Sequence, residues 1–524
     1  MSIPVSIHHG PFTTNTLTSK KFLIIYILII WGSIIPSILE FYFFWKLVEK
    51  SYSLLLILLP IQIYLDYIIL VLSSIILAKI FLVIINLIHK PKEGIFERNK
   101  RNKDYYFWSL RAVVKKWPIW VSRFIPLPFV EKLNYKWFDN DSEFIELGKK
   151  IFIGKGCSIK ASIILGNYLI IKRVEIKDNV IVGSNSFITP GTQIDKNTII
   201  EAMSITKYNQ KLGPNSFYID NTNEKLDNKS KNLYQKLRNS VFNKNNNPND
   251  AFTNNVTNIA AQGGKFVKNF HYNLLIIAFI YFISYFIPTF GIIYYNLQFF
   301  IPYILQTPNF IHIFSSFPSL LILLITPLIF IALYIINLSI IILFSKIIYN
   351  LIQRKILIKE GVYHWNKKNK EYNNYFIRSF LLRYVKWKLQ RSPFPWLLIS
   401  GFNFIGNCNF GKNTVIEDSY IAKELLHIGK NTYLGRCLIE NHLWDKFLTI
   451  KSINIKDNVV VSDCCCIAPG SEIENNAFLL PLSVTAKNAK LNSKSLYSGA
   501  PLNKISKFEL IKIMNFNIDK IKLK

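Results

Sequence analysis

One short stretch in the last quarter of the chain gathers side chains that could move a proton. Glu440, Asn441 and His442 are followed by Asp445 and Lys446. Because an imidazole titrates near neutral pH, His442 could take a proton from an attacking amine, hydroxyl or thiol and return it. Asp445 or Glu440 could orient its second nitrogen and stabilise the imidazolium. We predict these three as catalytic residues; the alternative is a corner histidine with no role.

Two upstream residues are expected to lie near His442. Glu424 and His427 precede it by roughly one coil of the repeat described below and could line the same pocket, together with Asn441 and Lys446. We predict these four as substrate-binding residues, and lysines here could pair with phosphate groups of a donor. Only His427 and His442 lie near each other, and zinc needs at least three protein ligands, so no metal site is predicted.

The elements around these residues follow a six-residue period. An aliphatic residue recurs every six positions in two regions, at Ile153, Ile159, Leu165, Ile176, Val182, Ile188, Ile194 and Ile200, and again at Ile428, Leu434, Ile455, Val461, Ile467, Ile473 and Leu479. Glycine, asparagine and aspartate between them suit tight corners. The period predicts two left-handed parallel β-helix (hexapeptide-repeat) domains. Each ladder breaks once, and such breaks become loops on one face of a repeat structure.

The chain is internally duplicated. Lys92-Glu93-Gly94 recurs downstream as Lys359-Glu360-Gly361, and Ile176 to Val180 recurs as Ile455 to Val459. Matching the two ladder breaks places Tyr168 opposite His442 and predicts a longer break in the second copy. We therefore expect a structural first β-helix and a catalytic second one.

Four apolar blocks accompany the duplication. They run over 22–47, 53–88, 272–305 and 317–351, and each exceeds the roughly 20 residues that cross a bilayer. Lysines and arginines crowd the side that carries both ladders, which indicates the cytoplasmic face. The sequence therefore predicts a multi-pass membrane protein, with the N-terminus and both β-helices cytoplasmic. Topology and anionic lipids explain the net charge of +31, and no nucleic-acid motif is present.

These features divide the chain into seven segments. We expect a cytoplasmic N-terminus, a transmembrane hairpin, a basic segment with the first β-helix, a polar linker, a second transmembrane hairpin, a basic segment with the second β-helix, and a tail. The boundaries are 1–21, 22–90, 91–212, 213–271, 272–352, 353–508 and 509–524.

Several short motifs carry a family resemblance. They are Glu360-Gly361-Val362-Tyr363, Tyr375-Phe376-Ile377-Arg378, Glu424 to Gly429, His442-Leu443-Trp444-Asp445, Leu480-Pro481-Leu482-Ser483 and Gly499-Ala500-Pro501. Their order and spacing resemble the non-ribosomal peptide synthetase terminal-domain family, the membrane C-terminal region of ε-poly-lysine synthetase. The repeats themselves resemble hexapeptide-repeat acyltransferases. The resemblance implies that His442 is the base that joins an acyl or aminoacyl group to an amine.

The predicted function is a multi-pass membrane acyltransferase or aminoacyltransferase that forms an amide or ester bond. The chain shows no adenylation domain and no carrier-protein serine motif. We therefore expect no bound cofactor, a donor supplied as a coenzyme A or phosphopantetheine thioester, an amine or hydroxyl acceptor, and a separate adenylating or carrier protein as partner. The alternative is a non-catalytic membrane scaffold whose β-helices dock a partner enzyme.

Overall fold

The computed structural model describes two similar halves of the chain. It covers residues 20–99, 101–122, 141–219, 224–225, 270–355, 359–363, 370–506 and 509–510, with short gaps at 155–156, 166–167, 184–185, 202–203, 418 and 445–447. We call residues 20–225 the first half and residues 270–510 the second half. Of the predicted polar linker (213–271) the structure describes 213–219, 224–225 and 270–271, and most of the predicted tail lies outside the described residues.

Each half begins with a pair of long apolar helices. The first half has α1 (Lys20–Val48) and α2 (Tyr52–Ile88); the second has α7 (Phe270–Tyr295), which continues as the π-helix η6 (Asn296–Leu305), then the short α8 (His312–Ser315) and α9 (Phe317–Lys355). All four long segments have the length and hydropathy to cross a membrane, and they coincide with the four predicted apolar blocks. Pro60 and Pro327 lie inside α2 and α9.

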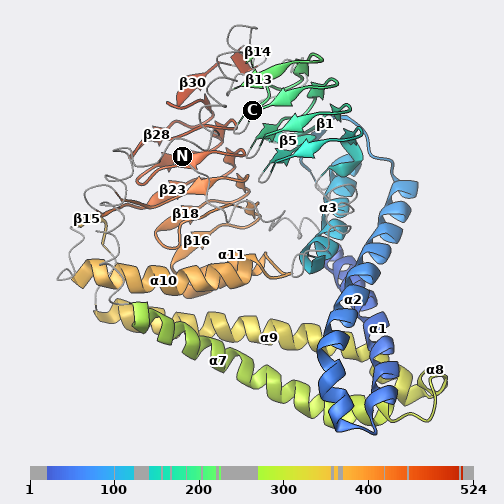
Figure 1. The fold of residues 1–524 in the computed structure, drawn as a ribbon. Coiled ribbons are helices and arrows are strands. Elements are labelled where there is room, and N and C mark those ends of the chain that lie inside the picture. Colours follow the sequence, from blue (N-terminus) through green and yellow to red (C-terminus); the bar gives the residue numbers. More distant parts are fainter. Residues whose placement is uncertain are drawn as a thin grey trace, which may run out of the picture.

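A shorter helix links each helical pair to strands. In the first half it is α3 (Lys103–Ser122), and in the second half α10 (Lys370–Gln390) is followed by α11 (Leu397–Ile405). Figure 1 shows the long helices on one side of the molecule, both sets of strands on the other, and α10 and α11 between α9 and the strands. The Trp120 indole donates a hydrogen bond to the Arg391 carbonyl (2.8 Å), which ties the end of α3 to the end of α10.

The strands of the first half form parallel sheets, which we call the first stack. Ile176 pairs with Ile194, and Ile194 pairs with Leu212, so three six-residue units separate neighbouring strands of a sheet. One sheet contains β2 (Ile145–Leu147), β7 (Val174–Ile176), β10 (Gln193–Ile194) and β12 (Lys211–Leu212). The others contain β3 (Phe152–Ile153), β8 (Ile181–Val182), β11 (Ile199–Ile200), β13 (Phe217–Ile219) and the antiparallel β14 (Glu224–Lys225), and β4 (Ser158–Ile159) with β9 (Phe187–Ile188).

The second stack repeats this arrangement, because Ile455, Ile473 and Leu491 pair in register with the same three-unit spacing. One sheet contains β16 (Cys408–Phe410), β18 (Leu426–Ile428), β23 (Ile453–Ile455), β26 (Glu472–Ile473) and β28 (Lys490–Leu491). A second contains β17 (Val415–Ile416), β19 (Tyr433–Leu434), β24 (Val460–Val461), β27 (Phe478–Leu479), β29 (Leu496–Ser498) and the antiparallel β30 (Asn503–Ile505). A third pairs β20 (Leu438–Ile439) with β25 (Cys466–Ile467).

Asparagines hold the corners of both stacks. Asn179, Asn197 and Asn215 all have φ between 51° and 59°, in the left-handed region that asparagine tolerates better than most residues. Their side chains also bond to one another: the Asn179 amide donates to Asn197 (3.1 Å), and the Asn197 amide donates to Asn215 (2.9 Å). The same residue thus permits the tight corner, as the sequence predicted, and also links corners that lie 18 residues apart in the chain.

An antiparallel hairpin interrupts each stack where the ladder breaks. In the first half β5 (Ser162–Leu165) and β6 (Tyr168–Ile171) pair with β1 (Gly94–Glu97); in the second, β21 (His442–Trp444) and β22 (Leu448–Ile450) pair with β15 (Gly361–Tyr363). The registers match, because Ile171 faces Gly94 and Ser162, while Ile450 faces Gly361 and His442.

This register corrects the predicted alignment of the two breaks. His442 corresponds to Ser162, not to Tyr168, which lies on the other strand of its hairpin. Leu165 likewise belongs to the hairpin rather than to the ladder. The prediction of a longer second break was also wrong, because the chain from Ile153 to its partner Val182 is slightly longer than the chain from Leu434 to its partner Val461.

Candidate functional site

His442 begins strand β21 and is partly buried at the edge of its hairpin. Its ring centroid lies 5.8 Å from that of Tyr375 on α10, and its Nδ1 lies 3.4 Å from the Asn441 side-chain oxygen. Burial lowers the pKa of His442 to about 4, and the nearby Lys423 ammonium acts in the same direction. The imidazole is therefore neutral at pH 7 and able to accept a proton.

This pKa makes the free energy of unfolding depend on pH. The unfolded chain binds a proton near pH 6.5 and the folded chain only near pH 4, so stability is full above pH 6.5 and falls as the pH drops from 6.5 towards 4. We expect the loss to be at most about 3 kcal/mol, because solvent screens a partly exposed ring. The His442→Gln variant should lack this part of the pH dependence. Denaturant titrations at pH 7 and pH 4.5 would measure it, and an identical pH dependence in both proteins would contradict it.

Buried charges surround the histidine. Lys423 and Lys386 are both nearly inaccessible to solvent. The Lys386 ammonium donates to the Ile421 carbonyl (3.0 Å) and lies 3.7 Å from the Tyr420 ring centroid. Burial lowers the pKa of Lys423 to about 8, and Arg383 lowers it too, while Glu424 and Glu440 oppose the change. Burial raises the pKa of Glu440, against the effect of both lysines.

The other predicted site residues are distributed unevenly. Asn441 is buried beside His442, and its side-chain nitrogen has no hydrogen-bond partner among the described residues. Glu424 is fully buried in a two-pronged ion pair with Arg378 of α10 (3.2 and 3.4 Å). His427, in β18, is exposed to solvent. Asp445 and Lys446 lie outside the described residues.

The matching position of the first half is built differently. Ser162 donates a hydrogen bond to one oxygen of the buried Asp141, and the indole of Trp108 donates to the other (2.8 Å). Trp108 of α3 and Tyr375 of α10 are equivalent in the duplication, because they stand at the same offset as Gly94 and Gly361. The Ser162 hydroxyl is therefore bonded to a carboxylate that also accepts a hydrogen bond from an indole. His442 instead lies near a phenol ring and an ammonium group.

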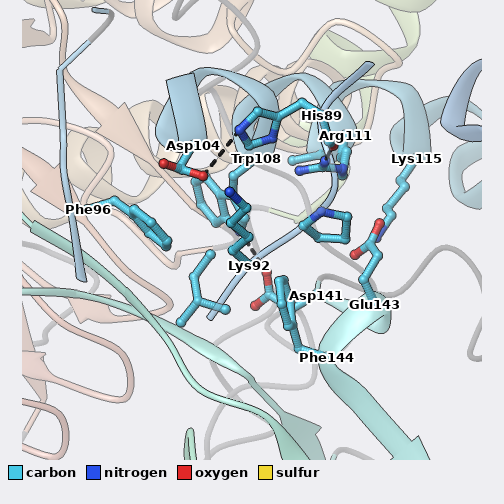
Figure 2. A pocket seen from close by; sticks show the side chains of 13 residues that line it. His89, Lys92, Phe96, Asp104, Trp108, Arg111, Lys115, Asp141, Glu143 and Phe144 are labelled. Atoms are coloured by element: carbon cyan, nitrogen blue, oxygen red, sulfur yellow. Dashed lines mark hydrogen bonds and ion pairs between the residues drawn. The ribbon is translucent and has the colours of Figure 1, made fainter. Parts of the chain in front are cut away.

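Beside Asp141 a cavity opens between α2, α3 and the start of the first stack (Figure 2). In it His89 contacts Asp104 (3.2 Å), and the Lys115 ammonium bonds Glu143 (2.7 Å). Arg111 bonds the Asn86 side chain (2.8 Å) instead of Glu143. The matching residues of the second half are Arg378 and Glu424, which pair directly because Leu382 occupies the position of Lys115.

The two hairpins are covered to different extents. The first packs Ile163, Leu165 and Ile170 against Leu480 and Leu496 of the second stack, and Ser162 is buried. In the second hairpin Leu448 and Ile450 pack against Tyr375, Tyr363 and Leu425, all from the same half. His442 and Leu443 keep partial exposure. The described structure thus leaves the second hairpin open at the position that the first one buries.

Sequence reasoning misses the partners of His442 that come from distant segments. Lys423, Lys386 and Tyr375 are not among the predicted site residues, although Tyr375 stands in one of the motifs above. The duplication does point to the neighbouring pair of Arg378 and Glu424. Arg111 and Arg378 are equivalent in the two halves, and each half also carries a matching glutamate, Glu143 or Glu424. Within the described ranges, no group of three histidine, cysteine or acidic residues could hold a metal ion.

Comparisons with known proteins give local likenesses. No protein-family model matches the chain, and no curated protein matches it. The resemblance to the peptide synthetase terminal region therefore stays a prediction.

Three solved structures illustrate the likeness. AntD, an N-acyltransferase from Bacillus cereus solved with a dTDP-amino sugar and coenzyme A, is 23% identical over 18% of this chain and 60% of its own, with a TM-score of 0.15. A hexapeptide-repeat acetyltransferase from Vibrio cholerae, complexed with acetyl-coenzyme A, is 13% identical over 27% of this chain and 92% of its own (TM-score 0.21). A maltose O-acetyltransferase from Clostridium difficile is 14% identical over 32% and 87% (TM-score 0.16). The chain thus spans under two thirds of the length of AntD. These TM-scores are too low to assign a function.

Proposed function

We propose that the protein is a multi-pass membrane acyltransferase or aminoacyltransferase that forms an amide or ester bond, with His442 as general base. One observation carries the proposal. At one hairpin register the first half buries a serine tied to Asp141, whereas the second half presents a neutral, partly exposed histidine among buried charges. On this proposal both stacks are left-handed β-helices, the segment boundaries are those expected from the sequence, and the stacks and N-terminus face the cytoplasm.

The proposed reaction needs one proton acceptor. If Nδ1 carries its proton towards the Asn441 oxygen, Nε2 keeps the free lone pair. Nε2 takes the proton as the acceptor amine or hydroxyl attacks a thioester carbonyl and the new C–N or C–O bond forms. The C–S bond then breaks, and the leaving thiolate takes the proton back from His442. The Lys423 ammonium disfavours the imidazolium and so favours this return.

The donor on this proposal is a coenzyme A or carrier-protein phosphopantetheine thioester, and a separate adenylating or carrier protein supplies it. Lys386, Lys423 and Arg383 give the surroundings of His442 a positive character suited to an anionic donor. Glu440 lies two residues before His442 and takes part, with Glu424, in the same charge cluster.

A second candidate is the membrane scaffold. It is favoured by the position of the two described cavities, which are lined by residues of α3 and the stacks and not by His442. On this alternative the open second hairpin is a docking surface for a partner enzyme.

A thioester assay separates the two candidates. The full chain in lipid nanodiscs is incubated with acetyl-coenzyme A or a lysyl-phosphopantetheine thioester and free lysine as acceptor. Thiol release and the mass of the product are then measured. Wild-type protein should transfer the group and His442→Ala should not, while His312→Ala, at the far end of the second helical pair, should behave as wild type. Equal transfer by His442→Ala would remove His442 from the mechanism.

A further inference from the structure

A second cavity lies between α3 and the two stacks, and we call it the inter-half cavity. Its polar lining residues include Ser109, Lys116, Asp141, Lys160, Ser162, Glu417, Tyr433 and Asp463, and its empty volume is about 590 Å³ including its opening. Asp141 also lines the cavity of Figure 2, so the two cavities adjoin at this residue. The lining comes from both halves of the chain.

The polar groups of this cavity are deeply buried. Ser109, Asp141 and Asp463 expose 2%, 6% and 5% of their surface, and Lys116 and Lys160 expose 8% and 9%. Lys160 reaches across the halves to Asp463 (2.6 Å). The Ser109 hydroxyl has no hydrogen-bond partner among the described residues. Because a buried hydroxyl without a partner is destabilising, the cavity favours an occupant that bonds to it.

The two halves differ in sequence at this cavity. Trp108 and Ser109 of α3 correspond to Tyr375 and Phe376 of α10 in the duplication. The second half therefore carries a phenylalanine where the first half has a serine that lines the cavity.

We propose that the inter-half cavity binds a small α-amino acid as its zwitterion. Lys116, Lys160 and the Ser109 hydroxyl are the groups that suit a carboxylate, and Asp141, Glu417 and Asp463 suit an ammonium group. A ligand that carries both charges offers a partner to each set. An anion or a cation alone would offer a partner to only one of them.

Binding here should also join the two halves. The occupant touches Ser109 and Lys160 of the first half together with Glu417 and Asp463 of the second. A ligand that binds only the folded protein raises its stability by mass action. The site does not depend on the proposed transfer, because His442 does not line it.

The test is calorimetric titration of the full chain in nanodiscs with L-alanine, with acetate and methylammonium as its two half-molecules. We expect L-alanine to bind and to raise the unfolding temperature, and each half-molecule to bind at least roughly tenfold more weakly, because it leaves one charge set unmatched. Ser109→Phe should weaken binding by at least roughly 100-fold, since the larger ring would occupy the space next to Ser109. Ser109→Ala should weaken it roughly 2- to 10-fold through the lost hydrogen bond.

Two controls keep the outcome decisive. Tyr106→Phe alters the same helix outside the cavity, and His442→Ala alters the proposed transfer site; both should bind L-alanine as wild type does. The proposal is overturned if wild-type protein does not bind L-alanine, if acetate or methylammonium binds equally tightly, or if Ser109→Ala and Ser109→Phe bind unchanged. Loss of transfer in His442→Ala with intact alanine binding would separate this site from the proposed reaction.

Discussion

Transfer by the His442→Ala variant is expected to fall by about 10²- to 10⁴-fold, the usual contribution of a general base. The physical reason is local: among the described residues of the second hairpin, the neutral imidazole of His442 can accept a proton at pH 7. Buried lysines beside it can stabilise negative charge, but cannot take the proton while protonated. Thiol release in the thioester assay measures the effect directly.

The pH profile supplies the control for this prediction. With His442 as base, kcat/KM should decline on the acid side near pH 4 rather than near 6.5. Lys423→Met removes a cation that lowers the pKa of His442, so it should move this decline to higher pH. A decline that stays in place in Lys423→Met, or a residual His442→Ala rate close to wild type, would argue against the mechanism.

Replacing Arg378 with methionine is expected to cost about 3–5 kcal/mol of unfolding free energy, because it strands a carboxylate without its partner. Arg378 and Glu424 expose 3% and 1% of their surface and form two hydrogen bonds to each other. Burial raises the pKa of Glu424 even with Arg378 present. Without the guanidinium, the carboxyl group must take up a proton or draw in water.

The double variant Arg378→Met/Glu424→Leu tests the cause. Removing both charges should recover most of the lost stability, since a buried pair and an apolar pair of similar volume are often close in free energy. As a matched exposed pair, Lys490 and Glu472 lie 3.3 Å apart, and Lys490→Met should cost about 0–1 kcal/mol. Denaturant unfolding of the four proteins gives the comparison; equal costs for Arg378→Met and Lys490→Met would disprove the assignment.

The regular elements could be predicted from the sequence because their signals are local. Four apolar runs coincide closely with the four long helices, and the six-residue ladder from Ile176 to Ile200 coincides with strands that pair every third unit. Hydrophobicity and period depend only on neighbours along the chain. The side of the membrane, by contrast, is a property of insertion and stays a prediction.

The alignment of the two breaks could not be found by the same means. The sequence places Tyr168 opposite His442 because both stand near an interruption and an asparagine precedes each. The true relation follows from the strand partners Ile171 and Ile450, which contact β1 and β15 far upstream in the chain. Strand pairing between segments this far apart in the chain depends on packing. In the sequence it is indicated only by the repeated glycines Gly94 and Gly361.

Only part of the candidate site could be predicted from the sequence. His442 could be predicted from its residue type. Its low pKa depends on burial and on Lys423, and neither can be inferred from the residues next to it in the sequence. The greater exposure of the second hairpin has a still more distant origin, since Leu480 and Leu496 cover the first hairpin and belong to the other half. Such asymmetry arises when two related units dock through different surfaces, so that a surface buried in one unit stays exposed in the other.

The hairpins make the stacks modular. Each one leaves its stack at one corner and rejoins it in register, so that Ile176 pairs with Leu147 and Ile455 pairs with Ile428. Changes inside a hairpin therefore need not disturb the coils above or below it, whereas an insertion in a coil is accommodated only in multiples of a full turn. A duplicated chain with this construction can keep two nearly identical frameworks while each interchangeable hairpin acquires its own chemistry.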